Sequence, residues 1–186
     1  MLSTTDAIVL SLQPHSDKAH ILHAYTRASG RVNYKVYGLG RKNSAEKYSP
    51  LSVVQLTTDE RSVRTAQLTY IPATITTDPY KRTIALFLGE VLFHVLKHPM
   101  PDEPMYDFLE QAVQALDRTD EPQNFHLEFL IAFAAKLGFA MEKEMNQPHT
   151  RTERQKSLQQ LCAYFAEHVE TWQNPRSLDV LMEVFD

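Results

Sequence analysis

The chain is poor in the residues on which many structural and catalytic sites depend. Its 186 residues include one cysteine, five glycines and one tryptophan, and they contain no long apolar run. The lone Cys162 excludes an internal disulfide framework and a multi-cysteine zinc site, and we expect it to be a buried, inert thiol. The opening MLSTTDAIVLSL has no basic segment and contains Asp6, which argues against a signal peptide or a membrane span. We therefore expect a soluble, cytoplasmic protein.

The common catalytic motifs are also missing. Gly38 and Gly40 are the closest glycines, but GLGRK lacks the third glycine of a dinucleotide fingerprint and the GK[ST] ending of a phosphate-binding loop. His94 and His98 have the spacing of a helical metal pair, yet Val95 stands where the zinc-protease pattern needs glutamate. We therefore expect no catalytic residues, no metal and no cofactor.

Charge is divided unevenly along the chain, whose formal net charge is −4. Residues 1–80 hold nine Lys/Arg and six Asp/Glu, a net of +3, whereas residues 81–186 hold 10 and 17, a net of −7. Residues 27–47 carry six Lys/Arg against the single acid Glu46. Such a concentration of cations indicates an anionic partner, most commonly a phosphate backbone. Chance is the competing explanation for the difference between the two regions, because a net charge of +3 over residues 1–80 is small.

Up to about residue 77 the chain has the pattern of short β-strands. Segments rich in Ile, Val, Leu and Tyr alternate with turn signals, and five strands are expected, at residues 6–12, 20–26, 31–37, 51–58 and 64–73. Five short antiparallel strands in this length are typical of an OB-type barrel, with a plain β-sandwich as the alternative.

The third of these segments predicts a strand with one apolar and one cationic face. Alternation places Val32, Tyr34 and Val36 on the apolar face. The other face carries polar and cationic side chains: Arg31, Asn33, Lys35 and Tyr37. OB-type barrels bind single strands through a cationic groove and exposed aromatics on which bases stack. Tyr37 suits stacking and packing equally, whereas packing is the better expectation for Tyr25 and Tyr48.

From Asp78 onward the apolar spacing becomes helical. Asp78 is a good N-cap residue, and Pro79 suits the first helical position. Five helices are expected: from Pro79 to near His98, from near Asp102, over 124–137 with Gly138 as its stop, over 153–172, and a short one capped by Ser177. We predict an α+β chain with an N-terminal five-stranded OB-type β-barrel that binds DNA (1–78) and an all-α helical domain (79–186).

Both parts resemble the bacterial RecO recombination mediators. The opening AIVLSLQPHSDKAHILHAYTRASGRVNYKVYGLGRKNSAEKYSPL is similar to the start of that family, and the helical part is similar in TIALFLGEVLFHVL, NFHLEFLIAFAAKLGF and SLDVLMEVF. Many members insert a four-cysteine zinc module after the LGF helix. Here the next helix follows quickly and those cysteines are absent, so this chain resembles a short form without zinc.

The resemblance implies a protein that breaks no covalent bond. It implies binding to single- and double-stranded DNA, annealing of complementary strands, and action with RecR to replace single-strand-binding protein by RecA, in the cytoplasm and associated with the nucleoid. DNA contact is carried over to Arg31, Lys35, Arg41 and Lys42. Weaker candidates are Arg27, Tyr37 and Lys47.

The resemblance also implies a second partner site. The helical domain of the family is said to receive the acidic, phenylalanine-ended tail of single-strand-binding protein, which requires a hydrophobic slot beside one or two cations. The candidate cations are Lys81, Arg82, Lys97 and Lys136. Two other functions stay open: a scaffold for RecR and single-strand-binding protein with weak DNA binding, and an unrelated OB-fold protein that binds RNA.

Overall fold

The structure, a computed structural model, describes residues 1–39, 45–141 and 148–184. It contains two compact units that interleave along the sequence. The first, here the barrel unit, comprises Met1–Pro72 and Leu96–Val113, and the second, the helical unit, comprises Ala73–Val95 and Gln114–Asp186. The barrel unit therefore includes a stretch that follows the first helix in sequence.

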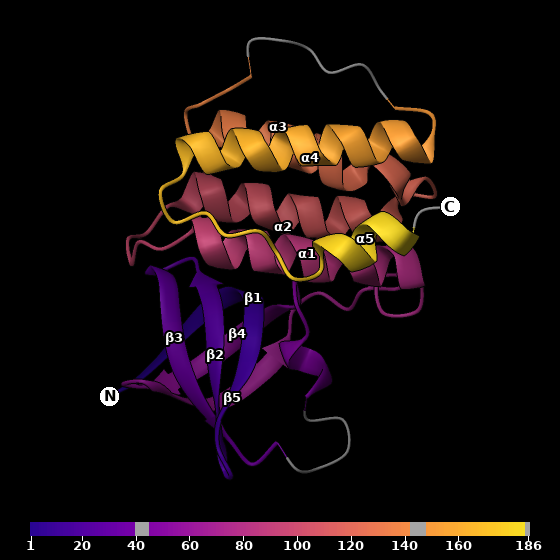
Figure 1. The fold of residues 1–186 in the computed structure, drawn as a ribbon. Helices are drawn as coiled ribbons and strands as arrows, with labels where there is room; N and C mark the ends of the chain where they lie inside the picture. The colour runs from indigo at the N-terminus through magenta and orange to yellow at the C-terminus, as the bar shows by residue number, and fades with distance from the viewer. Residues whose placement is uncertain (40–44, 142–147, 185–186) are drawn as a thin grey trace. The chain divides into compact units, whose positions relative to one another are not determined.

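Five strands form the closed barrel that the sequence predicts (Figure 1). They are β1 (Leu2–Ser16), β2 (Ala19–Thr26), β3 (Gly30–Tyr37), β4 (Val53–Asp59) and β5 (Ser62–Leu68). Their order around the barrel is β1-β2-β3-β5-β4, and every pair is antiparallel except β3 with β5. This five-stranded closure confirms the OB-type barrel and excludes the β-sandwich.

Strand β1 is much longer than the expected 6–12 because it has two partners. Its first half pairs with β4, from Leu2 opposite Asp59 to Ile8 opposite Val53. Its second half pairs with β2 as far as Ser16, with a register shift after Val9. Both ends are exposed, so no burial alternation marks them, although backbone hydrogen bonds extend them.

The barrel core confirms the alternation expected for the third strand. Tyr34 and Val36 of β3 are buried, and Val32 packs against them. They share the core with residues from every other strand, including Val9, Leu22, Val54, Leu56 and Ala66. The opposite side chains of β3 therefore point out of the barrel.

The five expected helices are also present (Figure 1). They are α1 (Pro79–Val95), α2 (Glu103–Arg118), α3 (Phe125–Lys136), α4 (Arg151–His168) and α5 (Leu178–Val184), with 3-10 turns η1 (Glu46–Tyr48) and η2 (Pro122–Asn124). Helices α3 and α4 lie side by side, and α1 contacts α3 and α5. None of the described helices combines the length and hydropathy needed to cross a membrane.

Local capping sets several helix boundaries. The Asp78 carboxylate accepts hydrogen bonds from the backbone N–H groups of Tyr80 (2.8 Å) and Lys81 (3.3 Å), as expected for an N-cap. Gly138 follows α3 with φ +91°, where a side chain would be strained. Ser177 directly precedes α5, and its carbonyl accepts a hydrogen bond from the Leu181 backbone N–H at 2.9 Å, whereas its hydroxyl donates to the Glu90 carboxylate at 2.8 Å.

Two boundaries differ from expectation. Helix α1 ends at Val95, so His98 lies beyond it and the two histidines do not share a helix face. Helix α4 ends at His168 rather than Trp172. In the helical unit the Trp172 ring instead packs on Phe165, with centroids 5.2 Å apart. The helix ends where Val169 adopts an extended backbone, with φ −121° and ψ 105°.

The helical unit buries polar groups as well as aromatic rings. Phe133 of α3 stacks on Phe165 of α4 with centroids 6.0 Å apart. Asp117 is 4% exposed, and its carboxylate accepts from the backbone N–H groups of residues 73, 74 and 75 at 2.9, 2.8 and 3.0 Å. Cys162 is buried as expected, and burial raises the pKa of its thiol to about 11. The thiol is therefore protonated near neutral pH.

Candidate nucleic-acid interface

The outward side of β2 and β3 gathers the side chains best suited to bind a polyanion. The two strands pair along their whole length, from Ala19 opposite Tyr37 to Thr26 opposite Gly30. Asn33, Lys35 and Tyr37 are exposed, and Tyr37 is 57% exposed. Half-buried side chains lie opposite two of them on β2. We call this surface the β2–β3 face; it consists of Ile21, His23, Asn33, Lys35 and Tyr37.

Two flanking turns add cations to this face. OB folds bind oligonucleotides on the face of strands 2 and 3. Two loops also contribute, one between strands 1 and 2 and the other between strands 4 and 5. Lys18 is exposed in the β1–β2 turn. Arg61 is exposed in the β4–β5 turn, and its carbonyl oxygen accepts a hydrogen bond from the Lys35 backbone N–H at 2.7 Å. Our sequence analysis missed both residues, since each follows an acidic residue that masks its charge.

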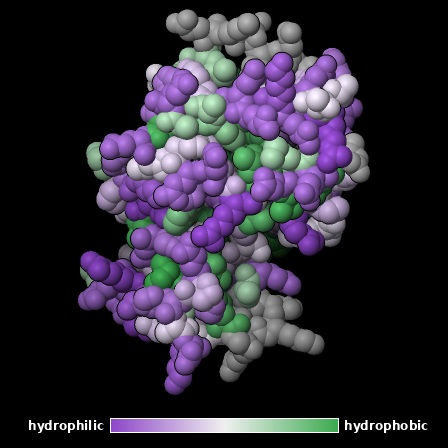
Figure 2. Space-filling model, in the orientation of Figure 1, coloured by the Kyte–Doolittle hydropathy of each residue, from purple (hydrophilic) through white to green (hydrophobic). Residues whose placement is uncertain are grey.

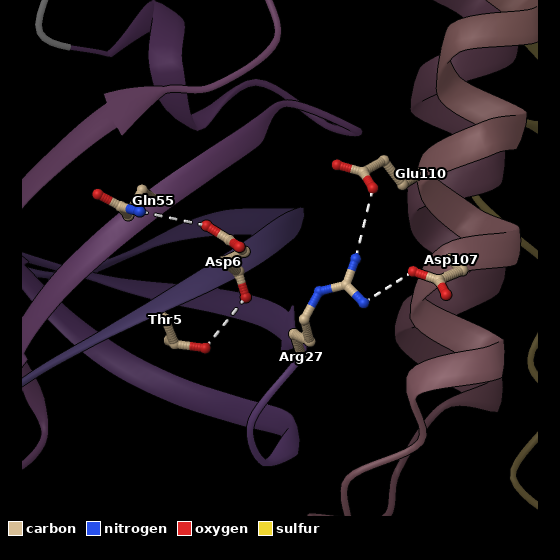
Figure 3. A network of polar contacts seen from close by, with 6 residues as sticks. All are labelled: Thr5, Asp6, Arg27, Gln55, Asp107 and Glu110. Carbon is tan, nitrogen blue, oxygen red and sulfur yellow. Dashed lines mark hydrogen bonds and ion pairs between the residues drawn. The ribbon is translucent and has the colours of Figure 1, made fainter.

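Arg27 makes ionic contacts within the barrel unit instead. One guanidinium nitrogen lies 2.7 Å from the Asp107 carboxylate and another 3.5 Å from that of Glu110, both on α2 (Figure 3). The guanidinium also lies 4.2 Å from the centroid of the Tyr106 ring. The structure therefore places Arg27 in a network that ties the β2–β3 turn to α2.

Arg31 lies on the expected side of β3 but is only 9% exposed. The Leu96–Met100 stretch lies beside it, since the Arg31 backbone N–H donates to the His98 carbonyl at 3.1 Å. Nη2 of Arg31 lies 3.1 Å from Nδ1 of His23, and Nε donates to Oδ1 of Asn33 at 3.4 Å. Burial lowers the pKa of Arg31 to about 10.

The other expected DNA contacts have varied positions. Lys47 donates from Nζ to the Ala66 carbonyl at 3.1 Å, which holds it against β5. Arg41 and Lys42 lie outside the described residues. Tyr25 and Tyr48 are each 4% exposed, which confirms that they pack rather than stack on a ligand.

Of the four candidate partner-binding cations, two donate hydrogen bonds within the helical unit. Lys81 is 4% exposed, and its Nζ donates to Oγ1 of Thr74 at 2.6 Å and to the Asp117 carbonyl at 2.8 Å. Arg82 donates to the Thr76 carbonyl.

The remaining two candidates, Lys97 and Lys136, are both exposed. Lys97 belongs to the barrel unit, whereas Lys136 is in the last turn of α3. The sequence analysis assigned both lysines to the helical domain.

The helical unit also contains a small cavity that the sequence analysis did not anticipate. Its lining combines arginines with apolar side chains: His126, Arg151, Arg154, Gln155, Leu158, Leu181 and Met182. The cavity volume is about 10 Å³, which is room for one water and too little for a phenyl ring. In both units hydrophilic residues predominate on the surface visible in Figure 2.

These features define an OB-fold protein with an additional helical unit. Residues 1–74 match the family model for the recombination protein O N terminal, and residues 76–144 match that for the recombination protein O C terminal. Together the two matches cover more than half of the chain. The chain belongs to the RecO family, as its resemblance indicated.

Relatives from several bacteria carry the name DNA repair protein RecO. That of Phocaeicola vulgatus is 34% identical, over 74% of this chain and 61% of the relative. Those of Flavobacterium johnsoniae and Christiangramia forsetii are 28% and 26% identical, and both alignments cover at least 97% of each chain. This chain spans about 61% of the length of the Phocaeicola vulgatus relative.

Proposed function

We propose that this chain acts in recombinational DNA repair as a DNA-binding, strand-annealing mediator that breaks no covalent bond. The observation that carries the proposal is the β2–β3 face, where Lys35 and Tyr37 are exposed between Lys18 and Arg61. Membership of the RecO family supports the role in repair.

Annealing follows from the chemistry of this face. Two complementary strands repel each other through their phosphates, and cations bound to one strand reduce that repulsion. Lys18, Lys35 and Arg61 make no side-chain hydrogen bond or ion pair with another described residue, so they are available to phosphates. Tyr37 can stack on one base, a contact worth about 1–3 kcal/mol in such sites. No cofactor or nucleotide is needed for this step.

We extend the proposal to the protein partners that the RecO resemblance implies. In it, the chain acts with RecR to exchange single-strand-binding protein for RecA on gapped DNA. Of the candidate cations for the tail of single-strand-binding protein, Arg82 and Lys136 are exposed in the helical unit, whereas Lys81 is buried. Charge reversal at the residue that binds the tail, tested with Arg82→Glu and Lys136→Glu, should abolish tail binding and leave DNA binding intact. If both variants still bind the tail, the site lies elsewhere.

One observation favours a second candidate, a scaffold for RecR and single-strand-binding protein with weak DNA binding. Arg27 is ion-paired with α2 and Arg31 is largely buried, so fewer cations face solvent than the sequence suggests. Titration of a labelled single strand, with and without RecR, separates the two functions. The scaffold predicts weak binding that RecR does not improve, and competition with RNA of matched sequence tests an RNA-binding protein.

The decisive experiment compares annealing of complementary oligonucleotides by the wild type and two charge-reversed variants. The test variant is Lys18→Glu, Lys35→Glu and Arg61→Glu in the barrel unit. The control changes three exposed cations of the helical unit by the same charge: Arg118→Glu, Lys156→Glu and Arg176→Glu. We expect the test variant to lose annealing and the control to retain it. The wild-type log–log salt slope should be about −2 if three phosphates are contacted.

The comparison is decisive because both variants change net charge equally. Equal losses would mean that only total charge matters, and the assignment to the β2–β3 face would be wrong. Absence of DNA binding by the wild type would overturn the proposed function as a whole.

A further inference from the structure

The β2–β3 face borders a segment that is not part of the barrel strands. Leu96–Met100 lies against the start of β3, where the His98 carbonyl accepts the hydrogen bond from the Arg31 backbone. Gly30 permits this approach, because a Cβ atom there would lie 2.1 Å from the Met100 carbonyl oxygen. Gly30 also has φ +63°, a conformation that favours glycine. The contact therefore brings the backbone of residues 96–100 beside Arg31.

Three polar side chains contact one another beside this segment, and Lys97 precedes His98, whose carbonyl makes the contact. The Arg31 guanidinium lies within 3.1 Å of Nδ1 of His23 and 3.4 Å of Oδ1 of Asn33. His23 and Asn33 also contact each other, with 2.7 Å between Nδ1 and Oδ1. The two contacts of Arg31 direct its guanidinium toward His23 and Asn33. Asn33 and Lys97 are exposed and His23 is half-buried, so solvent reaches these residues.

Three of these residues influence one another electrostatically. Burial lowers the pKa of Lys97, and the Arg31 charge lowers it further. Burial also lowers the pKa of His23, with smaller contributions from the charges of Arg31 and Lys97 and an opposing one from the Asn33 hydrogen bond. Like charges held this close create a positive potential that a bound anion would relieve.

We propose that His23, Arg31, Asn33 and Lys97 form a binding pocket for a phosphate group of the nucleic acid on the β2–β3 face. The inference rests on the proposed function and extends that site to Lys97, which comes from outside the barrel strands. A guanidinium held by neighbouring side chains matches the geometry of phosphate oxygens, and Lys97 adds a mobile charge. Asn33 lies two residues from Lys35 on the same strand, so the pocket is continuous with the rest of the face.

The first test measures oligonucleotide binding by variants of exposed lysines, which should fold normally. We expect Lys97→Gln to weaken binding of a fluorescein-labelled single strand about fivefold at 0.1 M salt and to reduce the salt slope by about 0.7, the loss of one phosphate contact. Lys156→Gln, an exposed lysine of α4, should change neither quantity. Lys97→Arg should restore binding. Equal affinities and slopes for Lys97→Gln and Lys156→Gln would overturn the pocket.

The second test distinguishes the source of the phosphate. The His23 ring resonances of the full chain are followed by NMR as inorganic phosphate or an oligonucleotide is added. Binding should shift them and raise the pKa of His23, since the anion offsets the charges of Arg31, Lys97 and neighbouring Lys35. A shift with the oligonucleotide alone supports a backbone phosphate, and a shift with both supports any phosphate group. If neither ligand shifts His23, the pocket is wrong.

The failure of the pocket can be distinguished from that of the proposed function. If the wild type binds oligonucleotides and Lys97→Gln binds them equally well, the pocket fails and the proposed function stands. If inorganic phosphate shifts His23 but no oligonucleotide binds, these side chains bind phosphate from another source, and both the proposed function and the assignment of the pocket to nucleic acid are wrong.

Discussion

Two groups of cationic side chains, one in each unit, have contrasting surroundings. In the barrel unit, Lys18, Lys35 and Arg61 are exposed and make no side-chain hydrogen bond or ion pair with another described residue. In the helical unit, cations donate to backbone carbonyls near helix ends: Lys81 to Asp117, Arg82 to Thr76, Arg151 to Met182 and Arg154 to His149. The cations of the second group therefore stabilise the helical unit, whereas those of the first group are the ones that the proposed function assigns to DNA.

The sharpest test of this contrast replaces one lysine in each unit by methionine. Lys81→Met should destabilise the protein by about 2–4 kcal/mol, because two buried acceptors lose a charged donor. Lys35→Met should change stability by less than about 0.5 kcal/mol but weaken DNA binding. Urea unfolding and oligonucleotide titration measure the two effects. If Lys81→Met is as stable as the wild type, the helical unit does not depend on its internal cations.

A second variant tests the contact between the start of β3 and residues 96–100 in the barrel unit. Gly30→Ala should cost about 2–3 kcal/mol, since a residue with φ +63° is strained and its Cβ meets the Met100 carbonyl. Gly38→Ala is the control, with φ +74° and no atom within 4 Å of the added Cβ. The melting temperature of Gly30→Ala in thermal unfolding should therefore be lower than that of Gly38→Ala. DNA affinity should fall only for Gly30→Ala, because displacement of residues 96–100 carries Lys97 away.

Acid should weaken the helical unit before the barrel unit. His126 is 2% exposed, and burial lowers its pKa to about 3, with the Arg154 charge adding to the shift. Since the pKa of His126 in the unfolded chain is near 6.5, the contribution of neutral His126 to the free energy of unfolding is complete above pH 6.5. That contribution declines as pH falls toward 3. The loss from this group should reach about 2 kcal/mol at pH 5.

The measurement uses Trp172, the only tryptophan, which lies in the helical unit and reports its unfolding by fluorescence. His126→Leu should flatten the pH dependence, whereas a change at exposed His168, such as His168→Gln, should leave it intact. A pH profile of His126→Leu that matches the wild type would assign the acid sensitivity to other groups.

The smallest effect is expected at Tyr37, which tests stacking separately from charge. Tyr37→Ala should weaken single-strand binding by about 1–2 kcal/mol, and Tyr37→Phe should retain it because the ring is kept. Neither change should alter stability, because the side chain is 57% exposed. Equal affinities for Ala and Phe at this position would show that the ring contacts no base.

Local signals predicted most of the elements of both units. Alternation identified β3 and its buried Tyr34 and Val36, and Asp78 marked the start of α1. The long β1 was underestimated because pairing with two strands, rather than burial, extends it. The hydrogen bond from Ser177 to Glu90, 87 residues away, was not predicted, because contacts between distant residues leave no local sequence signal.

For the binding surface, the sequence by itself determined which side chains of β3 leave the barrel, because alternation is a property of the extended backbone. It did not determine which of the outward cations meet solvent. Only the tertiary structure placed Arg27 against α2, buried Arg31 beside residues 96–100 and brought Arg61 beside Lys35. These outcomes depend on partners distant in the chain, and no local backbone preference encodes which distant groups will meet.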